Sequence, residues 1–326
     1  MLSKITGRVP FLACTLTIAV HLSAAPRQIL FFTKSSGFEH SVISWKDGQP
    51  SHAEKVLLKL GEKNGWEFTF SKDGSKFSKN YLARFDAVFF YTTGDLCSPG
   101  TDKQPPMTPA GKQAFVDFVR AGKGFIGTHS ASDTFHTNNE DKKGPDRYLN
   151  HGDQADPYVR FLGGEFIKHG AQQVAKNKAT DSKFPGFENV GTEFAFQEEW
   201  YSLKDFTPDI HVLTVIDAPS MNGVEYQRPP YPTTWARREG KGRVWFTAMG
   251  HREDVWTNPI FQEILVGGIK WTLGEASAEV PANLKEAAPH AYTNPPFPEP
   301  KPASAAPKAK STLLSPTESK NAGTTC

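Results

Sequence analysis

Short apolar runs alternate with predicted helices over the first half of the chain, and this alternation constrains the fold more than any other feature. The runs have the length and composition of buried strands, and they lie at residues 28–34, 66–72, 86–92 and 123–128. Ser51 and Glu54 have the spacing of a capping box, and Thr108 before Pro109 is a second helix-start signal. Strands and helices that alternate in this way are typical of a parallel sheet with helices on both faces.

The second half of the chain predicts strands of a different kind. Four strand-like segments follow one another without long helices between them, at residues 172–178, 192–197, 211–217 and 233–238. They predict antiparallel additions at one edge of the sheet. Residues 243–249 form another apolar run, and Asn258 before Pro259 caps a last predicted helix. The pattern therefore predicts an α/β fold with a mostly parallel sheet and antiparallel edge additions.

The first 25 residues have the composition of a secretory signal peptide. Lys4 and Arg8 precede an apolar run at residues 11–20, and small residues follow at 23–25. The run is too short to cross a bilayer comfortably, so we expect no integral membrane segment after cleavage. The sequence therefore predicts a periplasmic or secreted protein. Lipidation at Cys14 is the less favoured alternative, because too little apolar sequence precedes this residue.

Residues 276–326 are rich in Ala, Pro, Lys and Ser and show little periodicity. Such a segment buries too little apolar surface to offset its conformational entropy, so we expect a disordered tail. Deletion of residues 280–326 should therefore leave thermal stability nearly unchanged. Residues 26–275 then remain as one domain of ordinary size.

Cysteine content and charge argue against a disulfide-stapled protein and against a nucleic-acid-binding protein. Cleavage of the signal peptide would leave only Cys97 and Cys326, which is no disulfide framework. The formal net charge is +2, and part of the positive charge lies in the expected tail, so no basic stripe for nucleic acid is visible. We therefore expect no nucleic-acid partner.

The predicted strand at residues 123–128 breaks directly into the turn His129-Ser130-Ala131. This is the layout of a nucleophile elbow, in which the turn residue projects above the sheet. Imidazole is a good general base, proton donor or metal ligand near neutral pH, but it is not the usual acyl-accepting nucleophile. We expect the ring of His129 to lie in the largest polar cleft. The alternative is that His129 only caps the strand or packs at the edge of the core.

Four segments of the chain resemble the ThuA-like, or trehalose-utilisation, family. They are residues 122–133, 162–169, 198–201 and 240–251. The resemblance covers residues 27–274 and implies a flavodoxin-like, three-layer α/β sandwich similar to class I glutamine amidotransferases. It also implies a role with a carbohydrate or a keto-sugar.

Glutaminase chemistry requires a thiolate at the elbow that a histidine activates. The elbow of this chain carries His129, and the remaining candidate thiol, Cys97, follows the third predicted strand. A small residue that packs in a loop is the favoured interpretation of Cys97, because nothing nearby in sequence would lower its pKa. The sequence therefore argues against a glutaminase.

Ligands of open parallel sheets bind beyond the carboxyl ends of the strands, so the loops there carry the candidate site. We predict as catalytic residues His129, Asp133, Glu199 and His251. Aromatic rings and further polar groups are predicted to bind the substrate, and these are His40, Asp95, His169, Trp200, Tyr201 and Trp235. His136 and His151 are interpreted as exposed residues of a polar insertion at residues 134–156.

Two kinds of chemistry are open to such a set. The imidazoles and carboxylates can divide general acid and base roles on a sugar, or they can bind a divalent metal such as zinc. The spacing of His129, Asp133 and His136 is no standard ligand pattern, so the metal is the less favoured choice. A protein that binds carbohydrate without catalysis is the alternative from another class.

Overall fold

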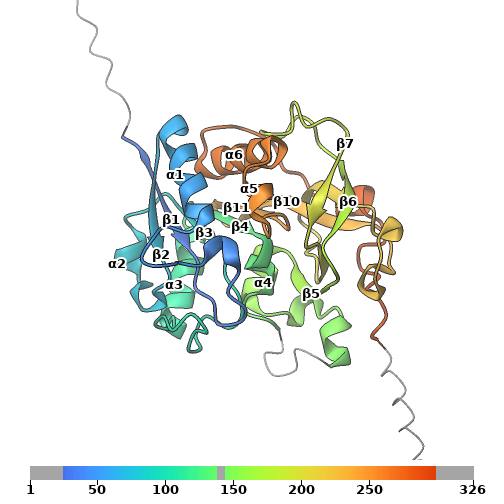
Figure 1. Cartoon of the computed structure of the whole chain (residues 1–326), viewed down its shortest axis with the longest axis horizontal. Coiled ribbons are helices and arrows are strands. Elements are labelled where there is room, and N and C mark those ends of the chain that lie inside the picture. The colour runs from blue at the N-terminus through green and yellow to red at the C-terminus, as the bar shows by residue number, and fades with distance from the viewer. Residues whose placement is uncertain (1–24, 138–143, 299–326) are drawn as a thin grey trace, which may run out of the picture.

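The computed structural model describes residues 25–137 and 144–298. Residues 1–24 of the expected signal peptide, with Cys14, therefore lie outside the described part, as do residues 299–326 of the expected tail. The central sheet has nine strands in the order β2-β1-β3-β4-β11-β10-β9-β6-β7 (Figure 1). In the described ranges, no helix is both long enough and apolar enough to cross a membrane.

One half of this sheet is parallel, as the alternation of strands and helices predicts. It consists of β2 (Trp66–Ser71), β1 (Arg27–Phe32), β3 (Ala87–Phe90), β4 (Gly124–Thr128) and β11 (Gly242–Thr247). β3 and β4 are buried at every position, which explains why their sequences are continuous apolar runs rather than alternating ones.

The other half of the sheet is antiparallel and confirms the predicted edge additions. It consists of β10 (Tyr231–Glu239), β9 (His211–Ile216), β6 (Gln173–Ala179) and β7 (Glu193–Glu198). A separate two-stranded sheet pairs β5 (Glu165–His169) with β8 (Tyr201–Lys204). The sequence analysis missed this small sheet, because both strands are short and begin within segments that it treated only as motifs, at residues 162–169 and 198–201.

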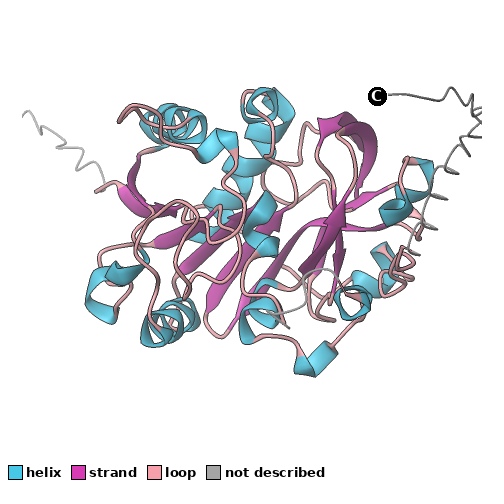
Figure 2. Ribbon diagram, turned by 60° about the horizontal axis from the view of Figure 1, so that its bottom comes forward, coloured by secondary structure: helices cyan, strands magenta, loops and turns pink. Residues whose placement is uncertain are grey.

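Helices cover both faces of the central sheet, so the fold is the expected three-layer α/β sandwich (Figure 2). One face carries α1 (His52–Asn64), α5 (Glu253–Trp256) and α6 (Pro259–Leu273), and the other carries α2 (Lys79–Leu82), α3 (Pro109–Arg120) and α4 (Pro157–Leu162). Short 3-10 helices lie at Ser41–Ile43, Gly74–Lys76, His129–Asp133, Pro145–Tyr148, Gly152–Gln154, Ala218–Ser220 and Val224–Tyr226.

The helix-start signals read from the sequence are all present as hydrogen bonds. Ser51 and Glu54 form the reciprocal capping box of α1. The Thr108 side chain accepts from the third residue of α3, and the Asn258 side chain accepts from the second and third residues of α6. In both of these helices proline occupies the first turn, where its missing N–H costs nothing.

The C-terminal segment corrects one domain boundary. Residues 276–298 do not form a free tail, because α7 (Leu284–Ala287) and the residues after it pack on the domain. Leu284, Ala288 and Ala291 are buried, and the Arg228 guanidinium donates a hydrogen bond of 2.8 Å to the carbonyl oxygen of Ala291. The Ala/Pro-rich composition hid these few apolar anchors, so the tail predicted from residue 276 begins too early.

Candidate active site

His129 lies where the fourth parallel strand ends, as the elbow pattern predicts. β4 ends at Thr128, and His129 begins a 3-10 helix with a φ of +44°, which is uncommon for a residue with a side chain. The ring is fully buried, because the rings of Tyr201, His40 and His251 surround it. The expectation that this ring lies in the largest polar cleft is therefore wrong.

The neighbouring strand β11 brings a second imidazole to the same place. Thr247 of β11 is paired with Thr128 of β4, so the two segments that follow these strands leave the sheet next to each other. Nδ1 of His129 lies 3.1 Å from the carbonyl oxygen of Ala248. Because a carbonyl oxygen only accepts, Nδ1 carries the proton and Nε2 keeps its lone pair. This Nε2 lies 3.2 Å from Nδ1 of His251.

Four side chains converge here, and we call them the His/Glu cluster: His40, His129, Glu199 and His251. One nitrogen or oxygen atom of each lies within 4.8 Å of the corresponding atoms of the others. Oε2 of Glu199 lies 3.0 Å from Nδ1 of His251 and 3.6 Å from Nε2 of His129. The structure thus brings together residues that are up to 211 positions apart, from His40 to His251. Their catalytic and binding roles remain predictions.

His169 and Tyr201 surround this cluster. Nδ1 of His169, at the end of β5, lies 3.2 Å from Oε1 of Glu199, and its side chain is 43% exposed. The Tyr201 ring packs on His129 with 4.1 Å between ring centroids, and its hydroxyl lies 3.3 Å from Nε2 of His40. Tyr201 is buried, so it supports the imidazoles rather than presenting a sugar-stacking face.

Glu198 fixes the turn that carries His251. Its Oε2 accepts backbone N–H bonds from Gly250, at 2.8 Å, and from His251, at 3.1 Å, while Oε1 accepts from Glu199 at 2.8 Å. Burial raises the pKa of this carboxyl to about 7, although the backbone hydrogen bonds act in the opposite direction. The sequence analysis missed Glu198, because alternation along a strand does not identify a buried acceptor.

The surroundings favour neutral imidazoles at His40 and His129 and an ionised carboxylate at Glu199. Burial lowers the pKa of His129, and burial with the charges of His129 and His251 lowers that of His40 well below its usual value. Burial would also lower the pKa of His251, but its hydrogen bond to Glu199 outweighs this and raises it. Burial would raise the pKa of Glu199, but the neighbouring imidazoles of His129 and His251 outweigh it and hold this pKa well below its usual value.

Asp133, predicted as catalytic, does not join the His/Glu cluster. Its Oδ1 pairs with Nε2 of His136 and with Nη2 of Arg147, the latter at 3.2 Å. His136 is buried and also bonds Oε1 of Glu165 at 2.8 Å, so the expectation of an exposed His136 is wrong. His151, in the same insertion, keeps 15% of its side-chain surface exposed.

A second set of side chains of the kinds that bind metals surrounds the ammonium group of Lys204. This set consists of His151, Glu165 and Asp205. The buried Nζ of Lys204 lies 3.0 Å from Nδ1 of His151, 3.0 Å from a carboxylate oxygen of Asp205 and 3.4 Å from one of Glu165. Because an ammonium group occupies the place where an ion would sit, we interpret this group as a structural ion network.

Three predicted substrate-binding residues have other roles. Trp200 and Trp235 are fully buried, and their indole N–H groups donate to the carbonyl oxygens of Gln173 and Leu162, at 3.2 and 2.7 Å. Neither ring can therefore stack on a sugar. Asp95 accepts hydrogen bonds from the backbone of Cys97 and the hydroxyl of Ser98, both at 2.9 Å, and so stabilises its own loop. Burial raises the pKa of the Cys97 thiol, which disfavours a nucleophilic thiolate.

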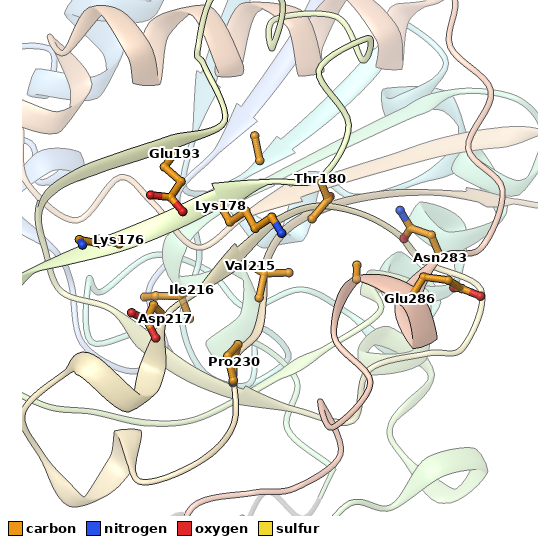
Figure 3. A pocket seen from close by; sticks show the side chains of 12 residues that line it. Lys176, Lys178, Thr180, Glu193, Val215, Ile216, Asp217, Pro230, Asn283 and Glu286 are labelled. Carbon is orange, nitrogen blue, oxygen red and sulfur yellow. The ribbon is translucent and has the colours of Figure 1, made fainter.

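Cavities large enough for a small molecule lie at two places in the described part of the chain. The first, of about 650 Å³, lies where β6 and β9 meet α7, and charged side chains such as Lys178 and Glu193 surround it (Figure 3). No residue of the His/Glu cluster lines it. The second, of about 670 Å³, is lined by Phe38, Asp133, His169 and others, and we call it the Phe38 cavity. His169 connects it to the cluster through Glu199.

The fold and the site define a flavodoxin-like α/β protein with an imidazole at the elbow position. The family model described as trehalose utilisation, ThuA, matches residues 28–272, and the chain belongs to this family.

Similar solved structures agree with this assignment. A ThuA-like protein from Bacteroides uniformis is 18% identical, with a TM-score of 0.55 over 78% of this chain and 95% of its own. A ThuA-like protein from Parabacteroides merdae is 16% identical, with a TM-score of 0.52 over 81% and 96%. At these identities the likeness shows the fold alone. No functionally curated protein has a significant match to the chain.

Proposed function

We propose that this protein is an enzyme that acts on a carbohydrate or an oxidised sugar, and that the His/Glu cluster holds one divalent metal ion such as zinc. The observation that supports the proposal most is the convergence of three imidazoles and one carboxylate within 4.8 Å. Histidine nitrogen and carboxylate oxygen are ordinary zinc ligands. ThuA membership supports the carbohydrate part of the proposal.

The spacing of the donor atoms fits such an ion. Ligands about 2.0–2.1 Å from a tetrahedral zinc lie roughly 3.3 Å from one another. The three pairs formed by His129 Nε2, His251 Nδ1 and Glu199 Oε2 are separated by 3.0, 3.2 and 3.6 Å. The hydrogen bond from His129 to Ala248 is the kind of outer-shell contact that orients a metal-binding histidine.

His40 supports the same interpretation. Its Nδ1 is buried and has no hydrogen-bond partner among the residues that the structure describes. An unpaired buried nitrogen is costly, and a bound ligand would remove this cost. Burial also keeps His40 and His129 in the neutral form that a metal requires, since it lowers both pKa values.

The residues around the cluster supply the rest of the chemistry. A bound metal would polarise a carbonyl or hydroxyl oxygen of the sugar. His169 is the partly exposed imidazole beside the cluster, and Glu199 orients it through Nδ1. We assign to its Nε2 the transfer of a proton at a carbon or oxygen of the sugar, for instance at a carbon made acidic by an adjacent carbonyl.

The experiment compares the full-length protein stripped of metal with protein reloaded with zinc or manganese. Turnover of trehalose, and of trehalose oxidised to a ketone on one ring, is followed by NMR. We expect turnover that falls more than about 100-fold on stripping and returns on reloading, since loss of outer-shell partners alone lowers metal affinity or activity 10–100-fold. Full turnover in protein without metal would overturn the metal role. Sugar binding without turnover would instead support the carbohydrate-binding alternative.

We also propose export from the cytoplasm, supported by the composition of residues 1–25. N-terminal sequencing of the protein purified from the native cells tests this. A mature chain that starts after residue 25 would support cleavage, whereas an intact N-terminus in the cytoplasmic fraction would contradict it.

A further inference from the structure

The Phe38 cavity lies beside the His/Glu cluster and combines aromatic and polar walls. Its volume of about 670 Å³ falls within the usual range for small-molecule sites. Phe38 connects it to the cluster, because its ring packs edge-on against His40 with 5.1 Å between ring centroids. Polar groups at the cavity include Asp133, Arg147 and His169.

Part of this cavity comes from outside the region that the family model covers. The match ends at residue 272, whereas Phe297 and Pro298 line the cavity. Phe297 packs against Tyr148, another lining residue, with 5.3 Å between ring centroids and an interplanar angle of 84°. The C-terminal segment therefore adds an aromatic pair to the wall.

Hydrogen bonds hold this segment in place from two sides. The side chain of Asn294 donates to the carbonyl oxygen of Tyr148 at 2.9 Å, and the side chain of Asn150 donates to that of Tyr292 at 2.8 Å. Upstream, the buried Arg228 binds the carbonyl oxygen of Ala291. Phe297 thus follows a docked stretch of chain rather than a free end.

Exposure separates these aromatic residues from ordinary core packing. Among the described phenylalanines, the two exposed ones are Phe38, at 70%, and Phe297, at 41%, and both line this cavity. An exposed phenylalanine ring contributes little to the core, whereas an apolar ring at a cavity wall can pack against the apolar face of a ligand. In the Phe38 cavity, the polar groups named above can then bind the ligand's hydroxyls.

We propose that the C-terminal segment at residues 288–298 completes the sugar-binding cavity and that Phe297, with Tyr148, contacts the part of the sugar that lies away from the His/Glu cluster. This inference rests on the proposed function for the identity of the ligand as a sugar. It assigns to a segment outside the family match a role in determining which sugar fits.

The test compares Phe297→Ala with wild type and with Tyr292→Ala, a matched control. Tyr292 is an aromatic residue of the same segment that is 46% exposed and does not line the cavity. Dissociation constants are measured by saturation-transfer NMR for trehalose, cellobiose and their mono-ketones. We expect Phe297→Ala to weaken binding of the best-bound sugar about twofold to twelvefold, since aromatic packing contributes about 0.5–1.5 kcal/mol. Tyr292→Ala should bind as wild type does.

Equal affinity of wild type and Phe297→Ala would overturn the inference, as would a wild-type protein that binds none of the four sugars. Metal content and turnover are measured on the same samples. Sugar affinity that depends on Phe297 in a protein without metal or turnover would contradict the proposed enzyme and leave this inference standing. Metal-dependent turnover with an unchanged KM in Phe297→Ala would support the proposed enzyme and contradict this inference.

Discussion

His129 and His251 follow neighbouring parallel strands, and their facing ring nitrogens lie 3.2 Å apart. Two nitrogens at this distance require that at least one of them keep a lone pair. The hydrogen bond from His129 Nδ1 to Ala248 leaves that lone pair on Nε2. The sheet therefore presents a pair of imidazoles to Glu199, and the proposed metal site depends on that arrangement.

The buried acceptor behind His251 gives the first prediction. Glu198→Gln replaces one of the two carboxylate oxygens with an amide nitrogen, so the side chain can no longer accept from Glu199 on one side and from Gly250 and His251 on the other. We expect zinc affinity to fall about 10–100-fold, as for other outer-shell partners. Calorimetric titration of the stripped protein with zinc measures this. Glu193→Gln, an exposed residue of the same strand β7, should change nothing, and equal zinc affinity in both variants would contradict a positioning role.

The ion network around Glu165 predicts a pH dependence of stability. Burial alone would raise the pKa of Glu165, but His136, Lys204 and Arg147 outweigh it and lower the pKa to about 2. A depressed folded-state pKa contributes stability above the unfolded-state value of about 4.5, and the contribution is lost as the pH falls from there towards 2. We expect a loss of up to about 3 kcal/mol over this window.

Urea unfolding at a series of pH values checks this expectation. Glu165→Gln should lower the free energy of unfolding at pH 7 and flatten its decline below pH 4.5. A decline of the same steepness in the variant would show that other carboxylates cause the acid sensitivity.

The docked C-terminal segment predicts different results for two truncations. A chain that ends at residue 275 loses buried Leu284, Ala288 and Ala291, so its free energy of unfolding should fall by at least about 2 kcal/mol, the lower bound for losing one large buried aliphatic side chain. A chain that ends at residue 298 keeps all of these contacts and should retain the wild-type stability. Thermal unfolding of both chains decides the point, and equal melting temperatures would show that the segment contributes nothing.

Sequence reasoning was accurate where a local rule determines the structure. Apolar runs and caps predicted the parallel strands, α1, α3 and α6, because strand burial and helix capping depend on neighbouring residues. The elbow pattern placed His129 at the end of β4. Parallel topology then predicted that His251 would come to the same edge, which the pairing of Thr128 with Thr247 explains.

The errors have a common physical origin, since burial is a tertiary property. Trp200 and Trp235 look like exposed sugar platforms because they flank predicted loops, but packing between layers covers both rings. His136 lies in a polar segment and is buried nonetheless, because the nearby Asp133 and the more distant Glu165 of β5 both pair with its ring. No local pattern distinguishes Asp133, which joins that network, from Glu199, which joins the cluster.

Metal content tests the central claim most directly. Protein purified from medium that contains zinc, manganese and iron is dialysed, and its metals are quantified by mass spectrometry. We expect about one metal ion per wild-type chain, much less than one in His129→Ala, His251→Ala and Glu199→Gln, and the wild-type amount in His290→Ala, which removes an exposed imidazole away from the cluster. Wild-type protein without stoichiometric metal, or cluster variants that retain the full amount, would contradict the proposed metal site.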